Sequence, residues 1–309
     1  MATIVVASAQ ELNIASYNVR NGKSLKPGQE MPQTGDYANC DGWDHRKQWL
    51  CDMINFEAFD IFGAQEVLRG QLDDMLAMLP DYGYVGVGRT DGADKGEFSP
   101  VFYRKKDFKL LDSGTFWLSE TPNEPSKGWD AKYSRICTWG YFQRNSDKAR
   151  FYFLSTHFDH RGTVARIESA KLIAKWIEKH CKGETAILVG DFNVSQTSDS
   201  YAVLVESGIL KDTYECAKIR FTPTGTFNGF NPQHYTTSRI DHVFVTKNVE
   251  VNRYGILTYH YLRDMEAEKS TMKNAPKEIL GERREVKCLS DHYAIQAFIT
   301  LNSGKKSKR

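Results

Sequence analysis

Polar side chains stand at the ends of several apolar, strand-like runs in this 309-residue sequence. Charged and amide groups at such positions are costly to bury unless they are paired or bind a metal ion. Because the pattern recurs, it indicates one shared site at a rim of the sheets, although periodicity does not prove that the runs meet. The residues concerned are Asn18, Glu66, His157, Asp191, Asn193, Asp241, His242, Asp291 and His292.

These residue types favour metal-assisted hydrolysis of a phosphate ester. Carboxylates and asparagine side chains are hard oxygen ligands, which suit Mg²⁺, Mn²⁺ or Ca²⁺ better than zinc. His157 and His292 can donate protons or carry positive charge beside a phosphate group. An aspartate such as Asp241 can hold an imidazole in one tautomer. Strand alternation does not decide whether Asp241 or His242 points into the site.

Simpler interpretations exist for single residues. Asn18 could be a turn residue, and Asp191 could form an Asx-turn with Asn193. Glu66 could favour a helix N-terminus, where acidic side chains are stabilising. These alternatives explain each residue separately, but they do not explain why the pattern recurs.

Three weaker candidates for substrate binding lie outside the strand ends. Arg135 could clamp a phosphate group, and Asp159 extends the site by its position after His157. Trp117 could stack on a base or a sugar ring. A buried structural aromatic residue is an equally good interpretation of Trp117.

The alternation of strands and helices predicts an α/β (α+β) fold of two packed sheets with helices outside. We expect a single domain over residues 10–301, with a polar surface insertion at 261–287. The periodicity predicts helices over residues 43–56, 71–79 and 164–180. The expected strands cover residues 12–19, 60–64, 82–87, 99–103, 108–111, 136–142, 151–156, 186–189, 240–245, 249–254 and 293–301.

Six motifs occur in an order and spacing that resemble the endonuclease/exonuclease/phosphatase superfamily, whose fold is deoxyribonuclease-I-like. They are SYNVR at 16–20, QE at 65–66, STHF at 155–158, GDFN at 190–193, RIDHVFV at 239–245 and SDH at 290–292. Each motif is weak alone, but the combination is specific and spans about residues 11–301. The resemblance implies a four-layer α/β/β/α sandwich of two packed mixed sheets. Residues 113–119, 128–130 and 135–139 look like a bacterial, often exported, subgroup.

The resemblance also implies a divalent-ion site, with Mg²⁺ as the expected cofactor and Mn²⁺ or Ca²⁺ as substitutes. Glu66 would be the principal ligand, with Asn18 beside it and Asp291 closing the site. Arg20 stands where the repair nucleases carry an acidic residue, which argues against an abasic-site enzyme.

Catalytic roles follow from the same resemblance. Asp191 would orient or deprotonate the attacking water, and Asn193 would hold that water or a phosphate oxygen. His292, paired with Asp241, would stabilise charge on the scissile phosphate. His157 matches a second histidine of many nuclease members, so the chain leans toward the deoxyribonucleases and deadenylases.

Composition limits the partners. With 41 Lys+Arg against 39 Asp+Glu, the net charge is only +2, which gives no support to bulk attraction for polyphosphate. The expected substrate is a phosphate ester, with DNA or RNA among the candidates, and the expected state is a monomer. No apolar run is long enough to span a bilayer, and segment 221–235 is too polar for an apolar wedge, so stable membrane insertion is not expected.

We therefore expect a metal-dependent hydrolase of phosphate esters. A nuclease or phosphodiesterase comes first. A phosphatase or phospholipase acting on sugar, inositol or lipid phosphates is the alternative, and an inactive binding scaffold is the least favoured. The experiment that separates them is an assay of both diester and monoester substrates.

The two ends of the sequence carry separate expectations. Residues 1–9 are interpreted as a signal-peptide remnant because a short apolar run closes with Ala-Ser-Ala. This predicts export to the periplasm or the extracellular space, with the cytoplasm as the alternative. Residues 302–309 are basic and predict a disordered tail.

Overall fold

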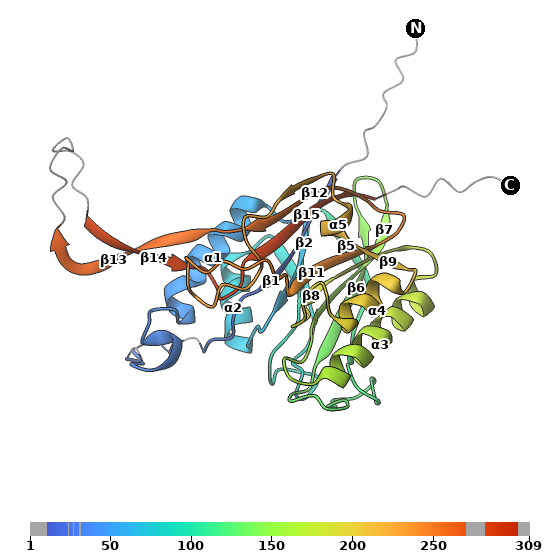
Figure 1. Ribbon diagram of the computed structural model, residues 1–309, viewed down its shortest axis with the longest axis horizontal. Coiled ribbons are helices and arrows are strands. Elements are labelled where there is room, and N and C mark those ends of the chain that lie inside the picture. Colours follow the sequence, from blue (N-terminus) through green and yellow to red (C-terminus); the bar gives the residue numbers. More distant parts are fainter. Residues whose placement is uncertain (1–10, 24, 27, 31, 270–281, 302–309) are drawn as a thin grey trace, which may run out of the picture.

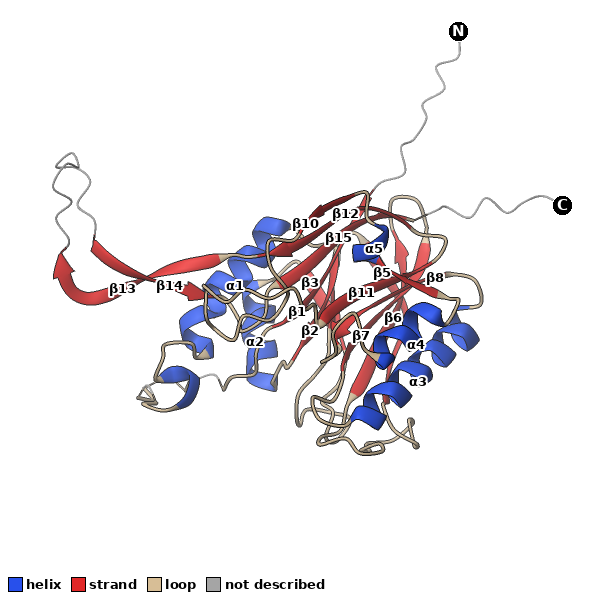
Figure 2. Cartoon of the chain, viewed as in Figure 1, coloured by secondary structure: helices blue, strands red, loops and turns tan. Residues whose placement is uncertain are grey.

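Two mixed β-sheets pack face to face, and helices cover their outer faces (Figures 1 and 2). The computed structural model describes residues 11–269 and 282–301, except 24, 27 and 31. The predicted four-layer α/β/β/α sandwich is therefore confirmed. The predicted signal-peptide remnant at 1–9 and the basic tail at 302–309 lie outside the described residues.

Among the described residues, the first sheet has seven strands in the order β10-β12-β15-β1-β2-β4-β3. Strand β1 runs parallel to β2 and antiparallel to β15, so β1 and β2 end at the same edge. The bounds are β1 Glu11–Asn18, β2 Ile61–Gln65, β3 Tyr82–Val85, β4 Val101–Arg104, β10 Ile219–Phe221, β12 Glu250–Leu257 and β15 Ala294–Thr300.

The second sheet has six strands among the described residues, in the order β5-β6-β7-β8-β11-β9. Strands β7 and β8 are parallel, and β11 is antiparallel to β8. The bounds are β5 Phe108–Trp117, β6 Ile136–Arg144, β7 Arg150–His157, β8 Thr185–Asp191, β9 Leu210–Asp212 and β11 Asp241–Thr246.

The helices form the two outer layers. Helices α1 (Trp43–Glu57) and α2 (Arg69–Met78) bury apolar side chains against the first sheet. Helices α3 (Thr163–Cys181) and α4 (Asp199–Glu206) do the same on the second sheet. The three predicted helices are confirmed to within a few residues, whereas α4 was not predicted. The remaining short helices are η1 Gly35–Tyr37 and α5 Thr213–Cys216.

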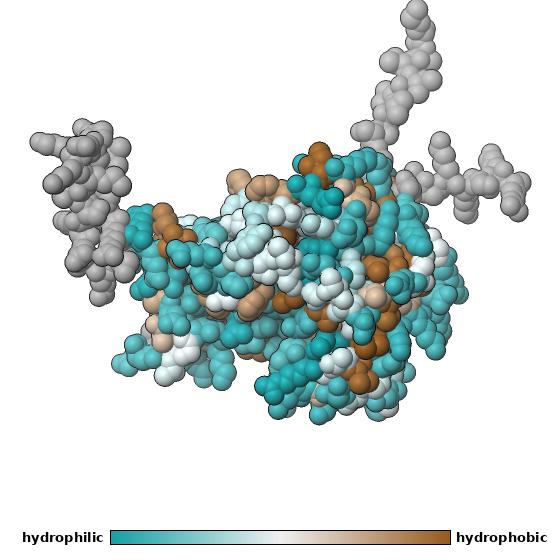
Figure 3. Space-filling view, in the orientation of Figure 1, coloured by the Kyte–Doolittle hydropathy of each residue, from teal (hydrophilic) through white to brown (hydrophobic). Residues whose placement is uncertain are grey.

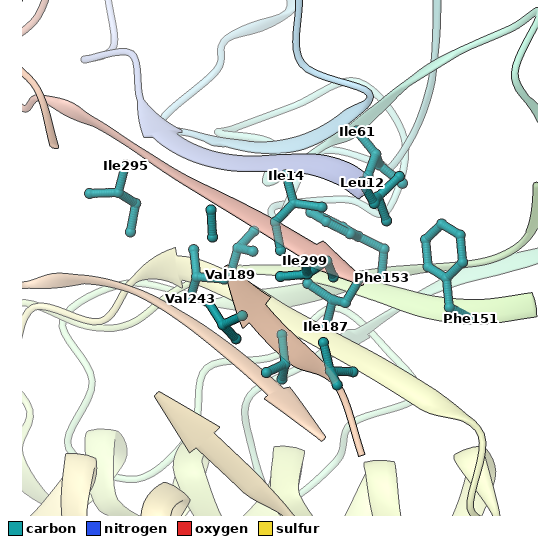
Figure 4. Packing of buried hydrophobic residues seen from close by; sticks show 14 of the residues in the cluster. Leu12, Ile14, Ile61, Phe151, Phe153, Ile187, Val189, Val243, Ile295 and Ile299 are labelled. Atoms are coloured by element: carbon teal, nitrogen blue, oxygen red, sulfur yellow. The ribbon is translucent and has the colours of Figure 1, made fainter. Parts of the chain in front are cut away.

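The main core lies between the two sheets. Apolar side chains from both sheets point toward one another there (Figure 4). The sheets approach so closely at Gly63 that a Cβ atom would lie 2.5 Å from Cγ2 of Val189 and 2.6 Å from Oγ of Ser155. Labelled members of this core are Leu12, Ile14, Ile61, Phe151, Phe153, Ile187, Val189, Val243, Ile295 and Ile299.

Of the predicted insertion at 261–287, the described residues 261–269 and 282–287 lie in a two-stranded ribbon that extends from the body of the molecule (Figure 1), and the rest lie outside the described residues. Its strands are β13 (His260–Lys269) and β14 (Glu282–Cys288), which pair antiparallel. On the face shown in Figure 3, hydrophilic residues cover most of the surface. In the part of the chain that the structure describes, no helix is both long and apolar enough to cross a bilayer. All six cysteines lie in that part, and each is a free thiol.

Candidate active site

The strand topology brings the predicted polar residues to one place. Asn18 ends β1 opposite Gln65, the last residue of β2, so Glu66 follows at the same edge. His157 ends β7 opposite Asp191, the last residue of β8. Because β11 is antiparallel to β8, its first residue, Asp241, also lies opposite Asp191.

A cavity of about 460 Å³ lies at this edge of the sheets. Most of the predicted catalytic and metal residues line it, and Asn18 and Asp241 contact those residues from behind. The cavity is lined by Arg20, Asn21, Glu66, Arg89, Glu97, Tyr133, Arg135, His157, His160, Asp191, Asn193, Phe227, Ile240, Asp291 and His292.

Glu66 is held as an ionised carboxylate. It has a left-handed backbone conformation (φ 64°) directly after β2. Its Oε2 accepts hydrogen bonds from the backbone N–H of Asn21 at 3.0 Å and from Asn21 Nδ2 at 2.8 Å. Burial raises the pKa of Glu66, but the hydrogen bonds from Asn21 and Asn18 outweigh burial and hold the pKa below its usual value.

Asn18 connects the carboxylates of the two sheets. Its Nδ2 donates to Oδ2 of Asp191 at 2.9 Å and to Oε1 of Glu66 at 3.2 Å, and it lies 3.5 Å from Nε2 of His292. The side chain is fully buried. A turn residue exposed to solvent would not have these contacts, so the amide of Asn18 fixes the spacing of the site.

His292 lies between two aspartates. Its Nδ1 is 2.9 Å from Oδ2 of Asp241, and its Nε2 is 3.7 Å from Oδ2 of Asp191. Burial lowers the pKa of His292, but the charges of Asp241 and Asp191 outweigh burial and raise it well above its usual value. Burial and the charge of Asp241 raise the pKa of Asp191. The imidazole of His292 therefore carries a proton at neutral pH.

The choice between Asp241 and His242 is resolved in favour of Asp241. His242 points to the other face of β11, where its ring packs against Phe192 and Tyr201 and its Nε2 lies 3.1 Å from the carbonyl of Val194. Tyr201 belongs to α4, so His242 packs under this helix on the outer face of the sheet, and it does not line the cavity.

His157 and Asn193 lie next to Asp191 in the site. Nδ2 of Asn193 lies 3.0 Å from Nε2 of His157 and donates to the carbonyl of Phe158 at 3.0 Å. Nε2 of His157 is 3.5 Å from Oδ2 of Asp191, and its buried Nδ1 has no hydrogen-bond partner among the described residues. Burial and the charges of Arg135 and Arg89 lower the pKa of His157, so this imidazole is neutral.

Asp291 lies on the other side of Glu66 and faces Arg20. Nη1 of Arg20 is 3.6 Å from Oδ2 of Asp291, and its Nε is 3.1 Å from Oδ2 of Asp36. Burial raises the pKa of Asp291, although the charge of His292 opposes this. The positive charge of Arg20 can also balance the negative charge of Asp291.

The donor set fits a divalent cation with oxygen ligands. Among the described residues, four carboxylates and three arginines line the cavity, and the buried Asp241 adds a further negative charge behind it. Ligand atoms of Glu66, His157 and Asp191 all lie within 4.8 Å of one another. Oxygen atoms dominate this set, as Mg²⁺ and Mn²⁺ prefer.

The three weaker candidates have different positions. Arg135 lines the cavity. Asp159 lies behind it, with Oδ2 3.5 Å from Nε of Arg135, and accepts the backbone N–H groups of Arg161 and Gly162. Trp117 is buried outside the cavity and donates its indole N–H to the carbonyl of Arg89 at 2.8 Å, so it is not placed to stack on a substrate there.

Several residues of the site were not predicted. Arg89 and Glu97 enter the cavity from a charged, glycine-containing loop between β3 and β4, and Tyr133 enters from the loop before β6. Phe227 packs edge-on against the ring of His292, with 5.1 Å between ring centroids. It belongs to segment 221–235, which the sequence suggested only as a poor membrane wedge.

Arg46 on α1 is a further unpredicted residue, and it supports the site from below. Its fully buried guanidinium donates to the carbonyls of Val19 at 2.5 Å, Arg20 at 2.8 Å, Asp41 at 2.9 Å and Leu289 at 3.2 Å. Val19 and Arg20 follow Asn18, Leu289 precedes Asp291, and Asp41 lies just before α1, so three of the four carbonyls belong to the two segments that carry Asn18 and Asp291. A single side chain therefore joins the two segments.

The comparison with protein families agrees with this geometry. Residues 15–292 match the model of the endonuclease/exonuclease/phosphatase family. The chain belongs to this family. The sequence resemblance is therefore confirmed, and members of this family act on phosphate esters.

Relatives within the family include two solved structures from Bacteroides thetaiotaomicron. One is an endonuclease/exonuclease/phosphatase family protein that is 42% identical, with a TM-score of 0.85, over 95% of this chain and 99% of that chain. The other is a mannosyl-6-phosphatase that is 43% identical, with a TM-score of 0.83, over 93% of this chain and 99% of that one.

A further relative is an uncharacterised protein, L388, of Acanthamoeba polyphaga mimivirus. It is 31% identical over 162 residues, which are 49% of this chain and 59% of the viral protein. The match therefore spans less than two thirds of that relative.

Proposed function

We propose that the protein is a divalent-metal-dependent phosphomonoesterase that acts on a hexose 6-phosphate, such as mannose 6-phosphate. The observation that carries the proposal is the 43% identity, over 93% of the chain, with a protein named as a mannosyl-6-phosphatase. The sequence alone placed a nuclease or phosphodiesterase first. The proposal reverses that order and keeps the sugar phosphatase that was the alternative.

The dimensions and charge of the site support a small substrate. A cavity of about 460 Å³ lies within the range of small-molecule sites. The basic residues are not concentrated in the sequence, yet Arg20, Arg89 and Arg135 converge on the cavity from three distant positions. The net charge of +2 gives no general attraction for a nucleic-acid backbone.

We propose that Glu66 holds the divalent ion together with Asp291 and the side-chain oxygen of Asn18, and that the ion is Mg²⁺ or Mn²⁺. The excess of carboxylates over arginines in the cavity supports this assignment. A bound divalent ion supplies Lewis-acid stabilisation of charge on the phosphate oxygens.

The protein residues would act on the water and on the phosphate. Asp191, a buried carboxylate with a raised pKa, accepts a proton from the attacking water. The water oxygen bonds to phosphorus, the bond to the sugar oxygen breaks, and that oxygen takes up a proton from solvent, to which Asp191 later returns the proton it accepted. His292 donates an N–H to a phosphate oxygen while Asp241 fixes its Nδ1. The amide of Asn193 orients the water or a phosphate oxygen.

The test is an assay of the purified protein with Mg²⁺, with Mn²⁺ and with EDTA. The substrates are mannose 6-phosphate, glucose 6-phosphate, p-nitrophenyl phosphate, bis-p-nitrophenyl phosphate, single-stranded DNA and RNA. We expect metal-dependent phosphate release from the hexose 6-phosphates at a kcat/KM at least tenfold above that for either diester class. Faster hydrolysis of DNA, RNA or bis-p-nitrophenyl phosphate would overturn the proposal in favour of a phosphodiesterase.

A further inference from the structure

One wall of the cavity consists of residues to which the proposed chemistry assigns no role. Arg89, Glu97, Tyr133, Arg135 and His160 all line the cavity, but they come from loops and not from the strand ends that carry the catalytic carboxylates. We call these five residues the loop wall. Because the loop wall lies beside the proposed catalytic residues, it is placed to contact the leaving group of the substrate.

Arg135 lines the cavity, and its guanidinium is incompletely hydrogen-bonded. The residue is only 5% exposed, and among the described residues its Nε and Nη1 have no hydrogen-bond partner. Nη2 lies 3.3 Å from Nδ1 of His160, and Nε lies 3.5 Å from Oδ2 of Asp159. Nη1 lies 3.9 Å from Oε2 of Glu97, so Nε and Nη1 have only long contacts with carboxylates. Because buried donors are nearly always paired in folded proteins, the guanidinium of Arg135 keeps unused donor capacity beside the cavity.

The charges of the loop wall are balanced. Nη1 of Arg89 is 2.5 Å from Oε2 of Glu97, and Asp159 lies beside Arg135. A second anionic group on the substrate would therefore meet Glu97 as well as the arginines. A neutral group with several hydroxyls fits better, because hydroxyls accept hydrogen bonds from Arg135 and donate them to Glu97.

Tyr133 adds a fixed aromatic surface to the loop wall. Its backbone N–H donates to Oδ2 of Asp159 at 3.2 Å, and the guanidinium carbon of Arg89 lies 5.2 Å from its ring centroid. The ring is near-parallel to that of His160, with 5.9 Å between centroids, yet Tyr133 remains 46% exposed. The exposed part of the ring can pack against the C–H face of a sugar.

We propose that the loop wall is the binding subsite for the leaving group and takes the hydroxyls of a neutral sugar ring, with Arg135 and Tyr133 as specificity-determining residues. The inference rests on the proposed phosphomonoesterase function. It adds the claim that this protein selects its substrate through the alcohol as well as through the phosphate.

The test compares kcat/KM for mannose 6-phosphate with kcat/KM for p-nitrophenyl phosphate in two variants. Arg135→Lys keeps the charge but loses the fork of donors, and we expect the ratio of the two values to fall about 10- to 100-fold. Tyr133→Ala removes the exposed ring, and we expect a fall of about three- to tenfold. The matched control is Phe56→Ala, which removes a 78% exposed aromatic side chain from α1 and should not change the ratio.

The outcomes separate the two proposals. If the wild type hydrolyses p-nitrophenyl phosphate but no sugar phosphate, the proposed function itself fails. If it hydrolyses mannose 6-phosphate and both variants keep the wild-type ratio, only the subsite is wrong. An equal loss on both substrates in Arg135→Lys would make Arg135 a phosphate ligand and would also overturn the subsite. Because Tyr133 is exposed, its variant remains decisive even if Arg135→Lys does not fold.

Discussion

Replacing Arg46 with methionine should weaken the packing of the segments that carry Asn18 and Asp291, although it changes no residue that lines the cavity. Methionine has a similar length but no donors, so the carbonyls of Val19, Asp41 and Leu289 would lose the partner that Arg46 provides. The carbonyl of Arg20 would also lose it, but would still accept from Nε2 of Gln71 at 3.0 Å. Among the residues that the structure describes, no carboxylate bonds directly to the buried guanidinium of Arg46. The stabilising contacts of Arg46 are these four backbone carbonyls and the rings of Trp43 and Phe230, whose centroids lie 5.2 and 5.6 Å from its guanidinium carbon.

The magnitude follows from those contacts. A buried acceptor left without a partner costs about 1–3 kcal/mol, and water that enters the space recovers part of that cost. We expect Arg46→Met to lower the free energy of unfolding by about 3–5 kcal/mol. Since the segments after Asn18 and before Asp291 are then no longer joined, kcat of the folded protein should also fall about tenfold or more.

Urea unfolding followed by circular dichroism measures the stability, and steady-state phosphate release measures kcat. Arg150→Met is the matched control, because Arg150 is exposed and its Nε lies 3.3 Å from Oε1 of Gln143. That change should cost under about 0.5 kcal/mol. A loss below about 1 kcal/mol in Arg46→Met, with kcat unchanged, would refute the reasoning.

Three other predictions follow from the structure and the sequence. Asp241→Ala and His292→Ala should each reduce kcat strongly, and the double variant should be close to the worse single variant because the pair acts as one unit; losses that multiply would contradict the pairing. Burial raises the pKa of Asp212, but the nearby imidazole of His242, with Nδ1 3.8 Å from Oδ2, and the hydrogen bond from Nη1 of Arg239 at 2.8 Å outweigh burial and lower the pKa to about 2. Asp212 therefore contributes stability above its unfolded pKa of about 4, and loses it as the pH falls through about 2. Asp212→Asn should cost about 2 kcal/mol at pH 7, and the difference from the wild type should vanish by pH 2 in acid-unfolding curves; a pH-independent difference would count against the assignment. Finally, if the protein is exported, N-terminal sequencing of protein from its native host should find Gln10 first, and an intact Met1 in the cytoplasmic fraction would contradict export.

The positions of many residues of the candidate site could be predicted because these residues break a local rule. Asn18, Glu66, His157 and Asp191 interrupt or end apolar strands, where polar groups are costly, so their positions alone indicated a site. The strand pairing needed for them to meet is a tertiary property. The sequence indicated this pairing only through the resemblance to a family. The same resemblance favoured Asp241 over His242 as the residue that points into the site.

The loop residues could not be predicted in the same way. Arg89, Glu97 and Tyr133 look like ordinary surface residues in the sequence, and only the folding of their loops over the cavity brings them to the site. Arg46 stands on an amphipathic helix, where an arginine normally faces solvent.

Strand β5 shows a related difficulty in the fold. It was predicted to end at residue 111, but after an irregularity between Leu110 and Asp112 it continues to Trp117. It is the edge strand of its sheet, where polar residues are tolerated on the open face. A search for apolar runs therefore ends such a strand too early.

The most direct test of the central claim is phosphate release from mannose 6-phosphate by metal-free protein as Mg²⁺ is added back, for the wild type and for Glu66→Gln. The substitution keeps the shape of the side chain and removes the charge of the principal ligand. We predict no turnover in EDTA, full recovery of the wild type with Mg²⁺, and almost none in a folded Glu66→Gln variant. Equal turnover in EDTA and in Mg²⁺, or recovery of the variant to the wild-type rate, would contradict the account.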